Sequence, residues 1–327
     1  MFYPIGVTSV TLRFAGSGYS QSQSLTTSRM TQLLGDSSQN RKIGIALVTL
    51  TTLMFATLDA SAKWLVLSLP VLQVVWMRFF THVAISVAIF APHMGWRILR
   101  VAHPRLQIMR GVMLALMTAL NFVALQYLQL AETGAIQFSV PILIAVLSSW
   151  WLKEKLDIAS WVAIWVGFAG VLVIIRPGSH AFHPAIFLSV MNALLYAGFN
   201  MLTRRLAASE HPVTTQLFSA LVATVVLTPF AWYQWQMPQG VGTWVVIFLT
   251  GLCGGLGHLC AAQAHRYASA AFLGPFLYQQ ILYMTLGGWL VFGQIPDHAV
   301  AIGAVVVVSS GMFLLWREMR AQVSSEL

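Results

Sequence analysis

Charged residues are scarce in this chain: Asp, Glu, Lys and Arg make up 8% of 327 residues, and only nine are acidic. Cysteine is also rare, and Cys253 and Cys260 lie seven apart in one apolar stretch. We interpret both as packing residues, since neither a disulfide scaffold nor a zinc site is built from two such positions. HExxH, a nucleophile elbow, a P-loop and a Rossmann fingerprint are also lacking, so we expect no enzyme, no cofactor and no metal.

Long apolar runs are what the chain has instead. Hydrophobic residues make up 58% of the sequence and the mean hydropathy is +0.76. Because a membrane helix needs roughly 20 mainly apolar residues, the pattern predicts an all-α integral membrane protein with ten transmembrane helices. They are expected at 44–64, 72–92, 108–127, 131–151, 158–176, 184–204, 213–233, 243–263, 270–292 and 297–316. The joins between the third and fourth and between the eighth and ninth helices are the least defined.

The basic residues predict an orientation. With both termini cytoplasmic, fifteen of the eighteen Lys and Arg residues fall on the cytoplasmic side, and only Lys63, Arg78 and Arg176 remain outside or near the outer face. This asymmetry is typical of a multi-pass protein of the bacterial inner (plasma) membrane. It also accounts for the pI near 10, so nucleic acid is not expected as a partner, whereas the lipid bilayer is.

A repeat divides the chain. The segment "WLKEKLDIASWVAIWVGFAGVLVIIR" (151–176) resembles "WLVFGQIPDHAVAIGAVVVVSSGMFLLWR" (289–317), about 140 residues later. Five helices per copy is an odd number, so the second copy should enter the membrane upside down, as in many secondary transporters. The alternative is that two apolar helices simply look alike. The expected divisions are a disordered cytoplasmic tail (1–43), the first repeat (44–177), the second repeat (184–318) and a C-terminal cytoplasmic tail (319–327). Met30 is a second candidate for the start of the chain.

Several motifs together resemble the drug/metabolite transporter (DMT) superfamily with two EamA-type repeats. They are "LDASAKWL" (58–65), "QVVWMRF" (73–79), "LNFVALQYLQLAETGAIQFSVPILIAVLSSWWLKEKLD" (120–157), "GFAGVLVIIRPG" (167–178), "GHLCAAQAHRYASAAFLGPFLY" (257–278) and "VFGQIPD" (291–297). Gln294 departs from the acidic residue usual in that family, so we do not expect a charge-based role at that position. The resemblance implies ten helices, cytoplasmic termini and transport of a small organic solute, without identifying it.

Polar stripes at helical spacing mark the face that each helix turns away from lipid. The sixth predicted helix carries one at offsets 0, 3, 7, 11 and 14: Ser189, Asn192, Tyr196, Asn200 and Thr203. Thr133, Gln137, Pro141 and Ser148 form another in the fourth, where Pro141 should kink the helix. A cavity lining is favoured, and hydrogen bonding between helices is the alternative. The glycines of "GLCGGLG" (251–257) indicate close packing or a mobile site.

Asp59 and Lys63 lie one helical turn apart, and Arg78 enters the second helix at a similar depth. We expect these three charges to cluster at the outer end of the cavity. A structural ion pair, with Lys63 reaching the interface, is one interpretation; an anion-binding or proton-exchanging site is the other. Glu132 and His258 are further candidates for proton coupling, with an interfacial and a packing role as their alternatives.

The sequence therefore predicts a secondary-active transporter that moves a small organic metabolite by alternating access. Riboflavin-like, nucleoside-like and amino-acid-derived solutes all suit it; a polytopic membrane enzyme and a non-transporting scaffold are the alternatives. Direction, ion coupling and a homodimeric state are left open. The expected pathway residues are Asp59, Lys63, Arg78, Asn121, Gln137, Asn192, Tyr196, Asn200, His258, Tyr278 and Gln279.

Overall fold

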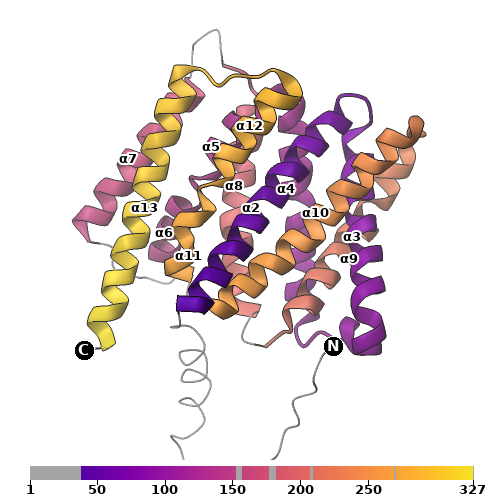
Figure 1. Cartoon of the computed structure of the whole chain (residues 1–327), viewed down its shortest axis with the longest axis horizontal. Helices are drawn as coiled ribbons and strands as arrows, with labels where there is room; N and C mark the ends of the chain where they lie inside the picture. Colours follow the sequence, from indigo (N-terminus) through magenta and orange to yellow (C-terminus); the bar gives the residue numbers. More distant parts are fainter. Residues whose placement is uncertain (1–37, 152–156, 177–181, 207–208, 269, 327) are drawn as a thin grey trace, which may run out of the picture.

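The computed structural model describes residues 38–151, 157–176, 182–206, 209–268 and 270–326. Within these ranges the chain folds into helices and no strand (Figure 1). The helices are α2 (Ser38–Val66), α3 (Val71–Met94), the 3-10 turn η1 (Gly95–Leu99), α4 (Pro104–Tyr127), α5 (Leu130–Gln137), α6 (Val140–Trp151), α7 (Ile158–Ile175), α8 (Ile186–Leu206), α9 (Pro212–Tyr233), α10 (Gly240–Tyr267), α11 (Ala270–Leu277), α12 (Gln280–Phe292) and α13 (His298–Glu326).

Nine helical runs among the described residues are long and apolar enough to cross a membrane. α5 and α6 together make one of them. A tenth path is formed by α11 and α12, which have 8 and 13 residues and follow one another through the bundle (Figure 1). The predicted ten-helix architecture is therefore confirmed in outline, with the fourth and ninth helices each built from two pieces.

Both end segments are more helical than the sequence predicted. α2 begins at Ser38 instead of residue 44, because Arg41 lies over the ring of Phe272, 5.4 Å from its centroid, so charged residues extend the helix beyond its apolar part. α13 likewise continues to Glu326, beyond the end at residue 316 that the sequence predicted for the last helix. The tail expected at 1–43 otherwise lies outside the described residues. α2 begins and α13 ends at the same end of the bundle, called here the terminal end (Figure 1).

The second repeat is inverted relative to the first, as equivalent helices show. Asp157 caps the start of α7 and pairs with Arg317 late in α13. Asp297 precedes α13 and pairs with Arg176, the residue that ends α7. The two helices are therefore antiparallel, although each occupies the fifth place in its own repeat. α3 and α9, the second helices, are antiparallel too: Trp76 near the start of α3 donates to Thr228 near the end of α9 at 3.0 Å.

The two broken helices meet at their breaks. α5 gives way to α6 at Phe138 and Ser139, and α11 gives way to α12 at Tyr278 and Gln279, 140 residues later. The rings of Phe138 and Tyr278 lie 5.1 Å apart. The kink predicted at Pro141 thus occurs just before it, because proline fits the first turn of α6 but could not continue a longer helix. Discontinuous helices of this kind leave backbone polar groups free near a solute site.

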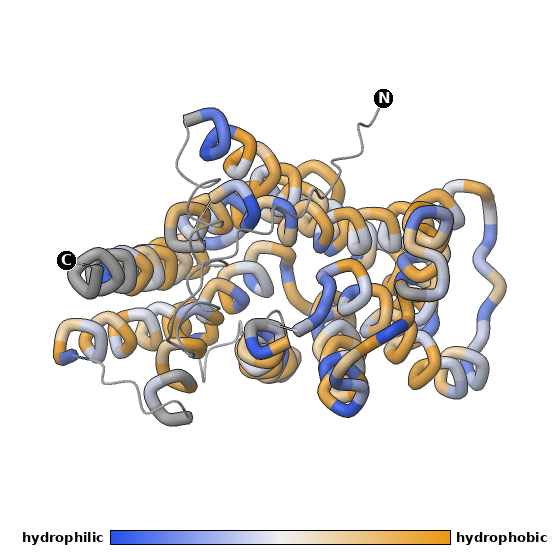
Figure 2. Tube along the Cα trace, turned by 90° about the horizontal axis from the view of Figure 1, so that it is seen from below, coloured by the Kyte–Doolittle hydropathy of each residue, from blue (hydrophilic) through white to orange (hydrophobic). Residues whose placement is uncertain are grey.

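Polar groups are turned inward and apolar ones outward. Gln73, Arg78, His82, Gln107 and Arg110 are buried, whereas many large hydrophobic side chains are exposed on the outside. Figure 2 shows hydrophobic residues over most of each helix and hydrophilic ones in short segments. This distribution is what a bilayer requires, since a polar side chain facing lipid is costly.

Candidate functional site

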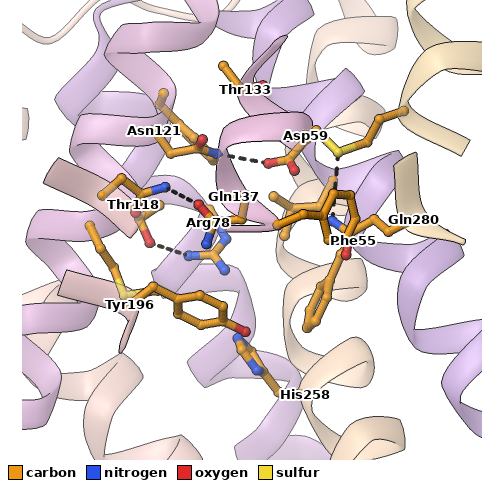
Figure 3. A pocket seen from close by; sticks show the side chains of 17 residues that line it. Phe55, Asp59, Arg78, Thr118, Asn121, Thr133, Gln137, Tyr196, His258 and Gln280 are labelled. Carbon is orange, nitrogen blue, oxygen red and sulfur yellow. Dashed lines mark hydrogen bonds between the residues drawn. The ribbon is translucent and has the colours of Figure 1, made fainter. Parts of the chain in front are cut away.

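A cavity lies between the two repeats, near the middle of the bundle. Its volume, counted as the space that the centre of a water molecule can occupy, is about 130 Å³, which corresponds to roughly four water molecules at about 30 Å³ each. Figure 3 shows its polar side chains converging from several helices. The lining residues are Phe55, Leu58, Asp59, Arg78, Met117, Thr118, Asn121, Phe122, Thr133, Gly134, Gln137, Phe138, Asn192, Tyr196, His258, Gln280 and Met284.

Two opposite charges, Asp59 on α2 and Arg78 on α3, face this cavity without being bonded to each other. Asn121 donates its amide to Asp59 at 3.0 Å, and Arg78 donates to the hydroxyl of Thr118 at 3.2 Å (Figure 3). Thr118 and Asn121 lie one turn apart on α4, so a single helix holds both charges. In the described part of the chain no ion pair neutralises either of them. The arrangement leaves both side chains facing the same cavity, each bonded to a neutral group of α4.

The glycines of α10 make room for the charged wall. A Cβ at Gly254 would lie 3.2 Å from Nε of Arg78, and one at Gly255 would lie 3.0 Å from the ring of His82. One at Gly251 would lie 2.4 Å from Thr81, and one at Gly257 would lie 2.7 Å from the ring of Phe55. The close-packing interpretation of this glycine run therefore describes the structure well. The close approach also seats Arg78 beside the cavity.

Amides and rings complete the lining. Asn192 on α8 donates to Gln137 on α5 at 3.0 Å, which links the second repeat to the first across the cavity. The ring of His258 meets that of Phe55 edge-on at 4.9 Å. Tyr196 has its hydroxyl turned toward His258 (Figure 3). Flat groups with polar edges on one side and two charges on the other suit a solute that has both a ring and a charged end.

Seven of the eleven predicted pathway residues line the cavity: Asp59, Arg78, Asn121, Gln137, Asn192, Tyr196 and His258. Their part in transport stays a prediction. Lys63 lies elsewhere, which corrects the expected three-charge cluster. Its ammonium donates to the carbonyl oxygens of Leu125 and Leu128, both at 2.7 Å, and so closes the C-terminal end of α4. A lysine at a helix C-terminus bonds free carbonyls and opposes the negative end of the helix dipole.

Four other predicted residues also lie outside the cavity lining. Asn200 donates to the carbonyl of Tyr196 in its own helix at 2.7 Å. Gln279 bonds Thr49 at 3.0 Å, and Tyr278 packs against Phe138. Glu132 accepts from the backbone N–H of Gln129 at 2.8 Å in a capping box at the start of α5. The capping box supports the structural alternative for Glu132. Asn200 and Gln279 are hydrogen-bonded to neighbouring groups, whereas the hydroxyl of Tyr278 is buried without a hydrogen-bond partner.

The cavity also contains polar residues that the predicted set lacked, Thr118 and Gln280 among them. Thr118 had a usable signal: Gln107, Arg110, Thr118 and Asn121 fall at offsets 0, 3, 11 and 14 on α4, the spacing of the stripe on α8. The described residues contain no group of three or more His, Cys, Asp or Glu side chains that could hold a metal ion. Cys253 and Cys260 are free thiols.

Comparison with known proteins places this architecture among transporters. The EamA-like transporter family matches residues 42–176 and 183–316. The chain is similar to an S-adenosylmethionine uptake transporter of Rickettsia bellii, 25% identical over 88% of this chain and 98% of that protein. A riboflavin transporter of Vibrio cholerae is 31% identical over 55% of this chain and 60% of its own length.

Two further similarities complete the comparison. The pseudopaline exporter CntI of Pseudomonas aeruginosa is 25% identical over 82% of this chain and 94% of that protein. One solved crystal structure superposes with a TM-score of 0.57 at 19% identity, covering 84% of this chain and 96% of the other. That structure shares the fold.

Proposed function

The chain belongs to the EamA-like transporter family, and from that premise we propose that it moves a small organic metabolite across a bacterial inner membrane by alternating access through the cavity at Asp59 and Arg78. No catalytic step and no cofactor are part of this function. One copy of the chain encloses the cavity, so a partner subunit is not required, although a homodimer is compatible with the proposal.

The observation that carries the proposal is the pair of unpaired charges. Asp59 and Arg78 are each bonded to a neutral side chain of α4 and both face the same cavity. Charged groups inside a membrane protein are costly unless they are paired or serve a pathway. The solute that fits these two side chains best has a cationic group that pairs with Asp59 and an anionic group that pairs with Arg78.

The rest of the lining favours a ring next to that charged end. Phe55, Tyr196 and His258 offer flat faces, and Gln137 and Asn192 offer amide edges. Among solutes that the relatives' names mention, S-adenosylmethionine combines an adenine ring with amino and carboxylate groups, whereas riboflavin is an uncharged ring system. The geometry therefore favours the first of these chemical classes for this chain.

Sidedness and energy source belong to the same proposal. Both termini are placed in the cytoplasm because of the basic-residue asymmetry. Asp59 and His258, which face the cavity, are the candidate proton-coupling groups. Glu132 is not carried forward, since it is engaged in capping α5.

Uptake into proteoliposomes tests the function. Purified protein is reconstituted and offered S-adenosylmethionine and riboflavin at equal concentration, with and without an imposed pH gradient, and the lumen is analysed by mass spectrometry. The same vesicles are offered a bacterial metabolite extract. We expect protein-dependent accumulation of an unmodified solute that bears both charges. Accumulation of nothing from the extract, or recovery of a chemically altered compound, would contradict the proposal. Asp297→Asn, which changes an exposed carboxylate far from the cavity, serves as the matched active control.

A further inference from the structure

A second buried guanidinium, Arg110, lies in the described chain away from the cavity lining. It is fully buried on α4, two turns from the terminal end of that helix. Its Nε donates to the hydroxyl of Thr203 on α8 at 2.9 Å. Its Nη1 donates to the carbonyl of Thr215 at 3.2 Å and to the hydroxyl of Ser219 at 2.6 Å, both on α9. We call these four residues the Arg110 cluster.

The Arg110 cluster holds a positive charge with no counter-charge. All its partners are neutral, and no carboxylate of the described residues pairs with it. Nη2 of the same guanidinium is buried and has no hydrogen-bond partner. A buried cation surrounded only by neutral groups lacks the compensation that such charges normally have. The group that would compensate the charge of Arg110 is an anion.

Arg110 is also connected to the cavity. By helix rise it lies about 12 Å along α4 from Thr118, which holds Arg78. Its guanidinium stacks over the ring of Phe199, 4.2 Å from the centroid. Phe199 in turn stacks with Tyr196, centroid to centroid 6.2 Å, and Tyr196 lines the cavity. Two rings of α8 thus separate one buried arginine from the other.

The Arg110 cluster joins the two repeats at the terminal end. Arg110 belongs to the first repeat, while Thr203, Thr215 and Ser219 belong to the second. Alternating access, on which this inference rests, requires the repeats to separate at that end in one of the two states. Separation would remove the partners of Arg110 and open a path to it from Tyr196.

We propose that Arg110 is a second anion-binding site, which receives the carboxylate or other anionic group of the solute when the terminal end opens. In the closed arrangement the hydroxyls of Thr203 and Ser219 occupy two of its donors, and a solute anion replaces them. The solute's negative group then passes from Arg78 to Arg110 while its ring moves past Tyr196.

Charge-selective cysteine labelling tests this site directly. In a Cys253→Ser, Cys260→Ser background, Ser219→Cys and, in a separate protein, Thr203→Cys place a thiol next to the guanidinium. Purified protein in detergent is treated with an anionic reagent, 2-sulfonatoethyl methanethiosulfonate, or a cationic one, 2-trimethylammonioethyl methanethiosulfonate. The quantity measured is the ratio of the labelling rate with the anionic reagent to the rate with the cationic one. We expect this ratio to be about ten or more, the size of effect expected for a nearby positive charge at intermediate dielectric. Adding Arg110→Gln should reduce that ratio to the value at His103→Cys, an exposed position at the start of α4.

Each outcome decides the inference. A ratio that Arg110→Gln leaves unchanged, or a thiol at both positions that neither reagent reaches while His103→Cys is labelled, overturns it. Arg110→Lys preserves charge and should preserve the ratio, which separates electrostatic attraction from a folding defect. Solute exchange is measured on the same preparations: exchange without charge-selective labelling contradicts only the second site, whereas absence of exchange in the background protein itself contradicts the proposed function.

Discussion

Opposite charges occur in two regions of this protein, and the two regions treat them in opposite ways. In the antiparallel pair of α7 and α13, Asp157 bonds Arg317 and Asp297 bonds Arg176 directly. In the cavity, Asp59 and Arg78 face the same space but bond Asn121 and Thr118 instead. The first region lies at the helix ends, where its ion pairs are partly exposed; the second is enclosed within the bundle.

Under the proposed function, this difference separates a structural use of charge from a functional one. Around the paired charges, α7 and α13 pack closely: Ser310 donates to the carbonyl of Ala163 at 2.6 Å, and a Cβ at Gly303 would lie 2.5 Å from Ile174. The cavity charges, in contrast, adjoin open space. An unbonded Nε does not distinguish the two regions, because Nε of Arg176 lacks a partner as Nε of Arg78 does.

Neutralising a cavity charge should have the largest effect. Asp59→Asn preserves size and Arg78→Gln shortens the side chain, and each removes a charged hydrogen bond to the solute, which is worth about 1.5–3 kcal/mol. We expect the efficiency of solute exchange in proteoliposomes to fall roughly 10- to 100-fold, with membrane insertion unchanged. Asp157→Asn should exchange normally. Equal activity of all three variants would remove the distinction between the two regions.

Lys63→Met should lower stability without lowering specific transport. Lys63 is 3% exposed and bonds two carbonyls at the end of α4. Leaving buried acceptors unsatisfied costs about 1–3 kcal/mol, which should appear as a lower melting temperature in detergent. Transport per folded molecule should match the wild type, because Lys63 does not line the cavity. A selective loss of transport at normal stability would restore the three-charge cluster that the sequence predicted.

Gly254→Ala should move Arg78 and so impair the cavity moderately. The new methyl group would meet Nε and Nη2 of Arg78 at 3.2 and 3.3 Å. Overpacking a well-filled site costs about 1–3 kcal/mol, and here part of that is relieved by displacing the guanidinium. We expect solute exchange to fall roughly fivefold, less than for Arg78→Gln. Gly287→Ala is the control, because its Cβ would meet only Ala60, at 3.8 Å; identical behaviour of the two variants would contradict this account of the α10 glycines.

The ion pairs of α7 and α13 should give the smallest effect. Hydrogen bonds from Ser160 lower the pKa of Asp157, and the N–H of Val300 lowers that of Asp297. A carboxylate whose pKa is lower in the folded state contributes stability above its unfolded pKa of about 3.9 and loses that contribution as pH falls below it. Asp157→Asn or Asp297→Asn should shift the melting temperature at pH 7 by less than about 4 °C.

The pH dependence of melting checks the same assignment. The wild type should lose stability below about pH 4, and the double Asp→Asn variant should lose less over the same interval. A pH-dependent loss of the same size in the double variant would show that these two carboxylates are not responsible.

Hydropathy and repeat spacing predicted most of the fold, because lipid imposes length and polarity on every crossing. The 140-residue offset even relates the two helix breaks, at Phe138 and Tyr278. The end of each helix was less predictable, since Arg41 continues α2 by contact with Phe272, a residue more than 200 positions away.

The site was predictable to the extent that a helix face is. Periodicity placed Asn192 and Tyr196 inward, and both line the cavity. Periodicity does not show where the charged group at the end of a long side chain lies. Lys63 was therefore grouped with Asp59, although its ammonium bonds carbonyls at the C-terminal end of α4. Arg110 was counted with the loop charges that set orientation, because its partners on α8 and α9 are visible only once the repeats are packed together.

Countertransport across a reconstituted bilayer tests the central claim most directly. Vesicles containing wild type, Lys63→Met or Asp59→Asn protein are preloaded with the solute that the uptake screen identifies, and the entry of its isotopically labelled form is followed. The account predicts exchange in the wild type and in Lys63→Met, and exchange in Asp59→Asn that is slower by roughly 10- to 100-fold. Exchange by Asp59→Asn at the wild-type rate would contradict it.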